Sequence, residues 1–337
     1  MTKLEWRRLP APPLTFSPAG PVKMVSLMPY PLAALALASG RTRSSQKPKD
    51  DRTAAAIFLT PAFALVAIFI CLPICLTLWM SVNDVDQFGR FTGFVGLGHY
   101  ADLFADAQFV AAAWRTVIWT VSIVAVTTSI ALFLAVVLQQ KFRGRALVRG
   151  LLLLPWATGL VIVSLLWRWM AHPDFGAIGH VVNSVGFPTL RVEWLGNPAL
   201  AFPLMIWVGI WASIPFTTLV LAAGIQAIDT DLYEAATLDG ANQWRLFRDI
   251  TLPQLRPVLA VSILLNVIFV FNSFPIIWVM TEGGPAGATD TLITFLYRKG
   301  FRFYDMGAAS ATSVVVFAIL LIFAIIHTKT MWRNVLR

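Results

Sequence analysis

Six stretches of this sequence carry no charged residue and are long enough to cross a lipid bilayer, which takes about 20 residues of α-helix. They are 57–80, 116–138, 150–167, a stretch within 194–228, 257–281 and 306–326. Because lipid offers the backbone no hydrogen-bond partner, only helices and closed barrels cross it, and uncharged runs of this length indicate helices. The sequence therefore predicts an all-α integral membrane protein with six transmembrane helices. A hydrophobic content of 58% agrees with this class.

Lys and Arg residues are distributed unevenly between the two sides of the predicted spans. Nineteen of the 26 lie before the first span, in the loops 139–149 and 229–256, or after residue 326. Loops rich in Lys and Arg stay in the cytoplasm. We therefore predict a cytoplasmic tail (1–56), a transmembrane domain (57–328) and a short cytoplasmic tail (329–337). The net charge of +9 is attributed to the basic residues that set the membrane orientation, and nucleic acid is not expected as a partner.

The loop 229–256 is the one long polar segment between two very apolar ones. Asp229 or Thr230 can cap a first short helix there, because side-chain oxygens at this position accept from the free N–H groups of the first turn. Gly240 is expected to end that helix, since glycine adopts the left-handed C-terminal conformation without a steric penalty from Cβ.

A second short helix is expected after the glycine, with Asn242 as its cap and the aromatic residues Trp244 and Phe247 on it. Pro253 and Pro257 are expected to end it, because proline lacks the N–H that a helix interior uses. Two short helices with a small apolar face fit two interpretations. One is an amphipathic segment lying on the bilayer, and the other is a helix that docks in a groove of another protein.

The same loop contains the runs Glu234-Ala235-Ala236, Asp239-Gly240-Ala241 and Ile250-Thr251-Leu252-Pro253, followed by Pro257. These runs resemble the EAA loop of ABC importer permeases. In that family the loop is a cytoplasmic helix-turn-helix that sits in a cleft of the ATP-binding subunit. The resemblance implies that coupling to the ATPase is carried by Leu232, Glu234, Ala235, Ala236, Asp239 and Gly240.

After the fifth span the sequence runs from Trp278 to Pro285 (WVMTEGGP), then through Thr289, Thr291-Leu292 and Tyr297. This segment resembles the one that distinguishes carbohydrate-type permeases, including those for maltose and glycerol phosphate. The resemblance covers about residues 57–328, and the chain is similar to the first-type permease subunit. It implies import of a sugar or polyol by alternating access, with glycerol-3-phosphate as an alternative. The implied partners are a second permease subunit in a heterodimer, two ATP-binding subunits and an extracytoplasmic solute-binding protein. The implied location is a bacterial or archaeal cytoplasmic membrane.

The chain itself is not expected to be an enzyme. The sequence has no G-x-x-x-x-G-K-[S/T] phosphate loop, so ATP and Mg²⁺ are expected to bind the partner ATPase. No cofactor or metal is expected on this chain. A more distant alternative is a secondary transporter, but such a protein would place ionisable residues within its spans, and these six have none.

The fifth span carries a polar stripe at helical spacing, formed by Ser262, Asn266, Phe269 and Ser273, with Asn272 beside it. A neutral polyhydroxyl solute needs hydrogen-bonding amides and flat apolar surfaces rather than buried charges. We predict that the solute pathway is bordered by Asn266, Asn272, Ser273, Trp207 and Trp211. The alternative is that the asparagines only join helices to one another.

Overall fold

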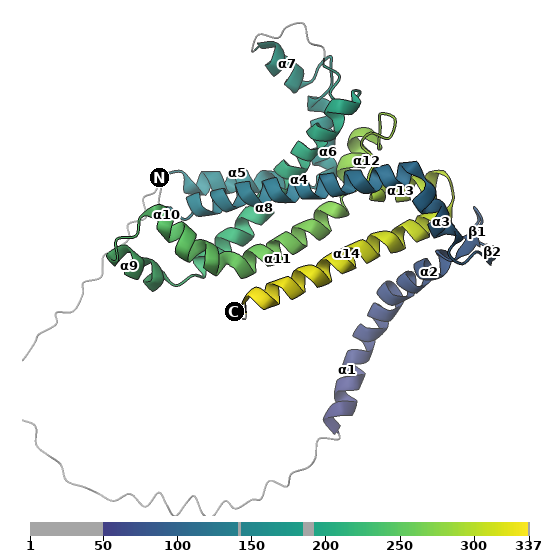
Figure 1. Ribbon diagram of the computed structural model, residues 1–337, viewed down its shortest axis with the longest axis horizontal. Coiled ribbons are helices and arrows are strands. Elements are labelled where there is room, and N and C mark those ends of the chain that lie inside the picture. Colours follow the sequence, from purple (N-terminus) through teal and green to yellow (C-terminus); the bar gives the residue numbers. More distant parts are fainter. Residues whose placement is uncertain (1–49, 141–142, 185–191, 336–337) are drawn as a thin grey trace, which may run out of the picture. The chain divides into compact units, whose positions relative to one another are not determined.

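The computed structural model describes residues 50–140, 143–184 and 192–335 and is mostly helical there (Figure 1). The predicted N-terminal tail lies outside the described residues up to position 49, as do Lys141, Arg191 and Arg337 among the basic residues used to predict topology. The chain divides into two units, Met1–Pro61 and Ala62–Arg337. Of the first unit the structure describes only the beginning of the first helix.

The first predicted span is a helix in three consecutive parts: α1 (Asp50–Val66), the π-helical turn η1 (Ala67–Cys71) and α2 (Leu72–Met80). Its apolar part, Ala56–Met80, agrees with the prediction. The helix itself begins at Asp50, inside the segment predicted as tail. A hairpin of two antiparallel strands, β1 (Asn83–Val85) and β2 (Phe91–Phe94), follows, and α3 (Gly98–Ala105) comes next.

Four long helices pack together in the second unit (Figure 1): α4 (Ala107–Val137), α8 (Pro198–Gln226), α11 (Leu252–Phe271) and α14 (Met306–Val335). Gly209 lets α8 approach α4 closely, because a Cβ at this position would lie 2.4 Å from Cδ1 of Ile123. The indole Nε1 of Trp119 donates to the carbonyl oxygen of Val270 at 2.9 Å, which ties α4 to α11 as well. These contacts form the apolar core around α4 and α8.

The third span is broken rather than curved. Helix α5 (Arg145–Ala157) and helix α6 (Leu160–Met170) are bent by 95° with respect to each other, and Figure 1 shows α6 turning away from the direction of α5. Pro155 lies within α5, before the break. The break follows at Gly159, whose φ of +72° is a conformation that glycine adopts readily. Helix α7 (Ala177–Ser184) comes after α6.

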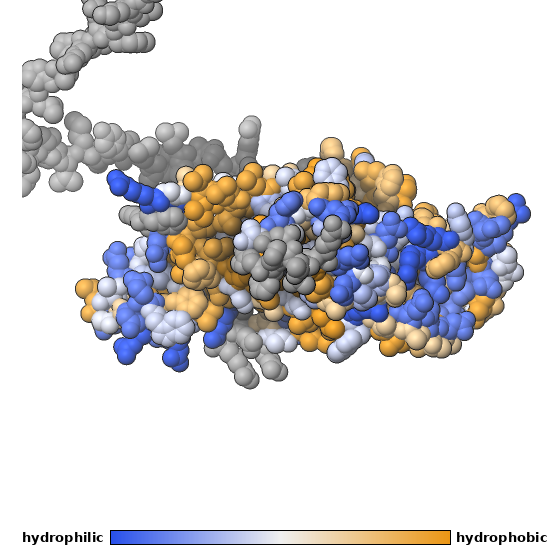
Figure 2. All heavy atoms as spheres, turned by 90° about the horizontal axis from the view of Figure 1, so that it is seen from above, coloured by the Kyte–Doolittle hydropathy of each residue, from blue (hydrophilic) through white to orange (hydrophobic). Residues whose placement is uncertain are grey.

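Within the described residues, five helices are long and apolar enough to cross a membrane, and the α5–α6 pair makes six if it is one bent span. Figure 2 shows hydrophobic residues gathered over the middle part of one face and hydrophilic residues toward both ends. The prediction of a six-helix, all-α membrane protein is confirmed.

The polar loop continues directly into the fifth span. It consists of α9 (Thr230–Leu238), α10 (Gln243–Arg245) and the π-helical turn η2 (Leu246–Thr251), and α11 follows without a break. The prediction that Pro253 and Pro257 end the second short helix is therefore wrong. Both lie inside α11, and Pro253 occupies its first turn, where a missing N–H is tolerated. The fifth span breaks later, between Phe271 and Pro275, where α12 (Pro275–Thr281) begins.

A loop with a buried carboxylate leads from α12 to α13 (Leu292–Tyr297), the π-helical turn η3 (Arg298–Arg302) and α14. Asp290, which lies outside the membrane spans, accepts hydrogen bonds from the Thr294 hydroxyl at 2.6 Å and from the Arg298 guanidinium. Burial raises the pKa of the Asp290 carboxyl, and the hydrogen bond from Thr294 and the charge of Arg298 offset part of this rise. The loop is thus held by an ion pair with little access to water.

Candidate functional site

Helix α9 is capped at both ends by residues of the loop itself. Oδ1 of Asp229 accepts from the N–H of Asp231 at 3.1 Å, as the predicted cap requires. At the other end Gly240 has a φ of +78°, and its N–H donates to the Thr237 carbonyl at 3.0 Å. The N–H of Ala241 donates to the Ala236 carbonyl at 2.9 Å. This pair of bonds is a Schellman motif, which requires a left-handed residue at position 240.

The predicted coupling residues lie on an exposed element. Glu234, Ala235, Asp239 and Gly240 are exposed and Ala236 is partly buried, while Leu232 is 43% exposed. Sequence reasoning missed Leu238, which is 90% exposed beside the glycine. The exposure of Leu238 could have been predicted from the sequence, because a leucine at the end of a polar surface helix has no apolar core to pack into. With Trp244, 66% exposed, it adds to an apolar surface at the tip of the loop.

The root of the loop is held by side chains that the motif does not include. The Tyr233 hydroxyl shares a 2.9 Å hydrogen bond with the Thr251 hydroxyl, which joins α9 to η2. Thr251 also donates to the Leu246 carbonyl at 3.2 Å. The rings of Trp244 and Phe247 lie 5.8 Å apart on the second helix. Because η2 continues into α11, α9 is fixed to the fifth span rather than to a flexible linker.

Among the predicted pathway residues, Asn266 is the best enclosed, at 4% exposure. Its Nδ2 donates to the hydroxyl of Thr217 on α8 at 3.0 Å and to the Ser262 carbonyl at 3.0 Å. The amide therefore joins α8 to α11, as the helix-joining alternative requires. Its side chain also borders a cavity, as the pathway hypothesis requires. Asn266 is therefore compatible with both hypotheses.

The other predicted pathway residues do not meet at one place. Asn272 is exposed, and its Nδ2 donates back to the Ile268 carbonyl of its own helix at 2.8 Å. Trp207 is half exposed, and Trp211 packs edge to face against Trp167 with ring centroids 5.8 Å apart. Ser273 is buried, and its hydroxyl has no hydrogen-bond partner in the described part of the chain.

The cavity at Asn266 has a volume of about 380 Å³ and lies where the break of the third span meets α8 and α11. It is lined by Pro155, Trp156, Gly159, Leu160, Ala212, Ser213, Phe216, Leu265, Asn266 and Phe269. Sequence reasoning missed the α5–α6 residues of this lining, because the 95° bend that brings them to Asn266 is a tertiary feature. The lining offers an amide, a hydroxyl and aromatic rings, and it has no charged side chain.

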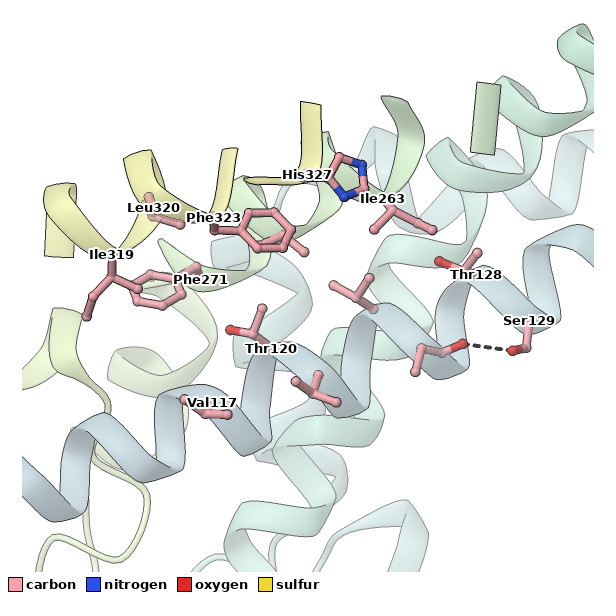
Figure 3. Close-up of a pocket in the computed structure, with 14 residues that line it drawn as sticks. Val117, Thr120, Thr128, Ser129, Ile263, Phe271, Ile319, Leu320, Phe323 and His327 are labelled. Atoms are coloured by element: carbon pink, nitrogen blue, oxygen red, sulfur yellow. Dashed lines mark hydrogen bonds between the residues drawn. The ribbon is translucent and has the colours of Figure 1, made fainter. Parts of the chain in front are cut away.

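A larger cavity of about 540 Å³ lies between α4, α11 and α14 (Figure 3). Val117, Thr120 and Thr128 line it from α4, and Ile319 and Phe323 from α14. The hydroxyls of Thr120 and Thr128 have no hydrogen-bond partner in the described residues. None of the predicted pathway residues is in this lining, and its surface is largely apolar, so it is a poorer match to a polyhydroxyl solute than the cavity at Asn266.

Residues 127–330 match the family of binding-protein-dependent transport system inner membrane components. This chain belongs to that family. The match contains the α9 loop, the α8–α11 contact and the cavity at Asn266, and it begins after the first span. The chain is therefore an ABC importer permease with several membrane spans, and a solute-binding protein is its partner.

Individual relatives agree with the assignment. The permease is 40% identical to a probable ABC transporter permease protein of Brucella suis biovar 1 (strain 1330), over 85% of this chain and 99% of that one. It is 36% identical to the trehalose/maltose transport system permease protein MalF of Thermococcus litoralis, over 81% and 92% of the two chains. A crystal structure of a bacterial alginate ABC transporter, in complex with its pentasaccharide-bound periplasmic protein, matches with a TM-score of 0.75 at 24% identity. That match covers 85% of this chain and 96% of the other and concerns the fold alone.

Proposed function

We propose that this permease moves a neutral sugar or related polyol from an external binding protein into the cytoplasm by alternating access. The observation that carries the proposal is the uncharged cavity at Asn266, which combines hydrogen-bonding groups with aromatic surfaces. The kinship with a trehalose/maltose permease supports the same solute class. Such a cavity suits a polyhydroxyl molecule, whose hydroxyls need hydrogen bonds and whose C–H faces need flat apolar contacts.

The hydrogen bonds in the cavity indicate how a solute would be held. Both N–H groups of Asn266 are already used, but its Oδ1 keeps a free lone pair. The Ser213 hydroxyl donates to the Gly209 carbonyl at 2.8 Å and can still accept. A solute hydroxyl would therefore donate to these two oxygens, while Trp156, Phe216 and Phe269 contact its apolar faces.

Glycerol-3-phosphate is the second candidate solute within the same class of importer. A phosphate in a cavity of low polarity is usually held by Arg or Lys, which supply charge-assisted hydrogen bonds. The residues that line the cavity at Asn266 include neither. The cavity in this chain therefore favours a neutral solute. To bind glycerol-3-phosphate, the importer would need an Arg or Lys from the partner permease.

Energy would come from ATP and Mg²⁺ bound by two partner subunits, which dock on the exposed α9 loop from the cytoplasm. The apolar tip of the loop, with Leu232, Leu238 and Trp244 exposed, is the kind of surface that fits a groove in another protein. Movement of the docked loop would pass through η2 into α11, since the helix runs without interruption from Gln243 to Phe271. The second permease subunit would complete the pathway as a heterodimer.

Ligand screening of the binding protein that works with this permease tests the solute class. Thermal shift against a panel of maltose, trehalose, sorbitol and glycerol-3-phosphate would identify the captured solute, and uptake of that solute by the reconstituted importer would follow. A neutral sugar or polyol is expected in both assays. Capture and uptake of glycerol-3-phosphate alone would reject the proposal while leaving the family assignment intact.

A further inference from the structure

A third cavity lies at the root of the α9 loop. It has a volume of about 420 Å³ and separates α9 and η2 from the ends of α4 and α8. It is lined by Val136, Gln139, Gln140, Ile225, Gln226, Ile228, Thr230, Tyr233, Gln243, Leu246, Phe247 and Thr251. Its size is within the range of small-molecule sites, about 300–1,000 Å³. It borders only the loop side of the fold and is lined by different residues from the cavity at Asn266.

Amide side chains dominate the polar part of this lining. Gln140, Gln226 and Gln243 are exposed and make no side-chain hydrogen bond within the described residues, so each offers both a donor and an acceptor. The Nε2 of Gln139 is used in a 3.0 Å bond to the Ala222 carbonyl, and the Tyr233 and Thr251 hydroxyls are bonded to each other. Phe247 supplies a ring, and no charged side chain is in the lining. This is the chemistry that a neutral polyhydroxyl molecule requires.

We propose that this cavity is a regulatory site that binds a neutral sugar or polyol from the loop side of the membrane. The class of ligand and the cytoplasmic position rest on the proposed function, in which the same class of solute accumulates on that side. A bound molecule would contact the α9 loop through Gln243, the end of α8 through Gln226 and the residues just after α4 through Gln140, and so would bridge loop and spans.

The position of the cavity explains how occupancy would act on transport. If the cycle moves α9 and η2 relative to the ends of α4 and α8, the shape of the cavity changes with each state. A ligand that fits one state better than another shifts the cycle toward it, by an amount equal to its difference in affinity. A molecule that bridges loop and spans would hold them together, and the expected effect is inhibition of import by the accumulated product.

Binding is tested without transport by labelling a single cysteine in the full-length chain. Cys71 and Cys75 are replaced by Ala, and Gln243→Cys places a thiol in the lining, while Gln254→Cys places one on an exposed position of α11 outside it. High-millimolar maltose or trehalose should slow maleimide labelling at position 243 several-fold and leave position 254 unchanged. Equal rates with and without both sugars at position 243 would overturn the site, whatever the importer transports.

Regulation is tested in the reconstituted importer with its ATPases outside the vesicle and loaded binding protein inside. Maltose or trehalose added outside should lower stimulated ATP hydrolysis several-fold, and Gln226→Leu, which replaces the amide by a shorter apolar side chain, should abolish this inhibition. Asn266→Ala is the discriminating variant. If it removes the inhibition and Gln226→Leu does not, the sugar acts through the transport cavity and the regulatory site is rejected. Failure of loaded binding protein to stimulate hydrolysis at all would instead count against the proposed function.

Discussion

The hydroxyls of Tyr233 and Thr251 lie 2.9 Å apart and join the exposed helix α9 to the turn that leads into the fifth span. Tyr233 stands next to Glu234 in the coupling motif, and Thr251 is buried at the start of α11. The exposed face of α9 therefore has a rigid connection to the helix that carries Asn266.

Replacing Tyr233 by Phe should weaken this connection without changing the exposed face of the loop. Loss of one hydrogen bond is expected to lower stability by about 1 kcal/mol, and uptake per ATP hydrolysed should fall. Thr251→Val should have at least this effect, because it also removes the bond to the Leu246 carbonyl. The double variant should be no worse than Thr251→Val alone, because the Tyr233–Thr251 interaction is then already lost. Thr237→Val is the matched control, since that hydroxyl donates only to the Tyr233 carbonyl within α9. An additive double variant would contradict the assignment.

Gly240→Val should stop uptake while the protein still reaches the membrane. A Cβ at this position would meet no atom within 4 Å, so the penalty comes from the φ of +78° alone. For a β-branched residue this conformation costs about 1 kcal/mol or more. Gly240→Asn is the control, because asparagine tolerates the left-handed region, and it should retain most of the uptake. Equal loss in both variants would indicate that the absence of a side chain matters, rather than the backbone conformation.

Glu234→Lys should also abolish coupling, since it reverses the charge on the exposed face of α9 that the ATP-binding subunit is proposed to contact. The check is the rate of ATP hydrolysis stimulated by loaded binding protein, compared with that of Glu234→Gln. Normal stimulation in the lysine variant would reject the docking role of this face.

The structure separates the two asparagines that the sequence grouped together. Asn266→Ala should break the bonds to Thr217 that join α8 to α11 and lower stability by about 1–3 kcal/mol, together with transport. Asn272→Ala should have little effect on either, because its amide is exposed and bonded to its own helix. Uptake and thermal unfolding of the two variants, measured side by side, check this order, and an equal loss of uptake would restore Asn272 to the pathway.

Much of the fold follows from local sequence signals. The spans, the caps of the loop helices and the glycine stop at 240 depend on residue type and spacing, and these predictions agree with the structure. The break at Gly159 and the run of α11 through Pro253 and Pro257 depend on how neighbouring helices pack. The break was not predicted from the sequence, and the two prolines were wrongly expected to end a helix. The cavity at Asn266 required that bend, so only its α11 side was predicted.

Breaking the ion pair between Asp290 and Arg298, in the segment from α12 to η3, should make the stability of the protein depend on pH. Burial raises the pKa of Asp290 above its ordinary value of 3.8, so the folded state holds this proton more tightly than the unfolded state. The corresponding stability is present at low pH and is lost as the pH rises through the raised pKa. Arg298→Ala removes the larger of two compensating charges and leaves Arg115, which should raise this pKa further and cost about 3–5 kcal/mol where the carboxyl is ionised. The melting temperature of the variant should therefore fall more at alkaline than at mildly acidic pH. Adding Asp290→Asn should remove the difference, because an amide does not titrate, and a pH-independent loss in Arg298→Ala alone would contradict the argument.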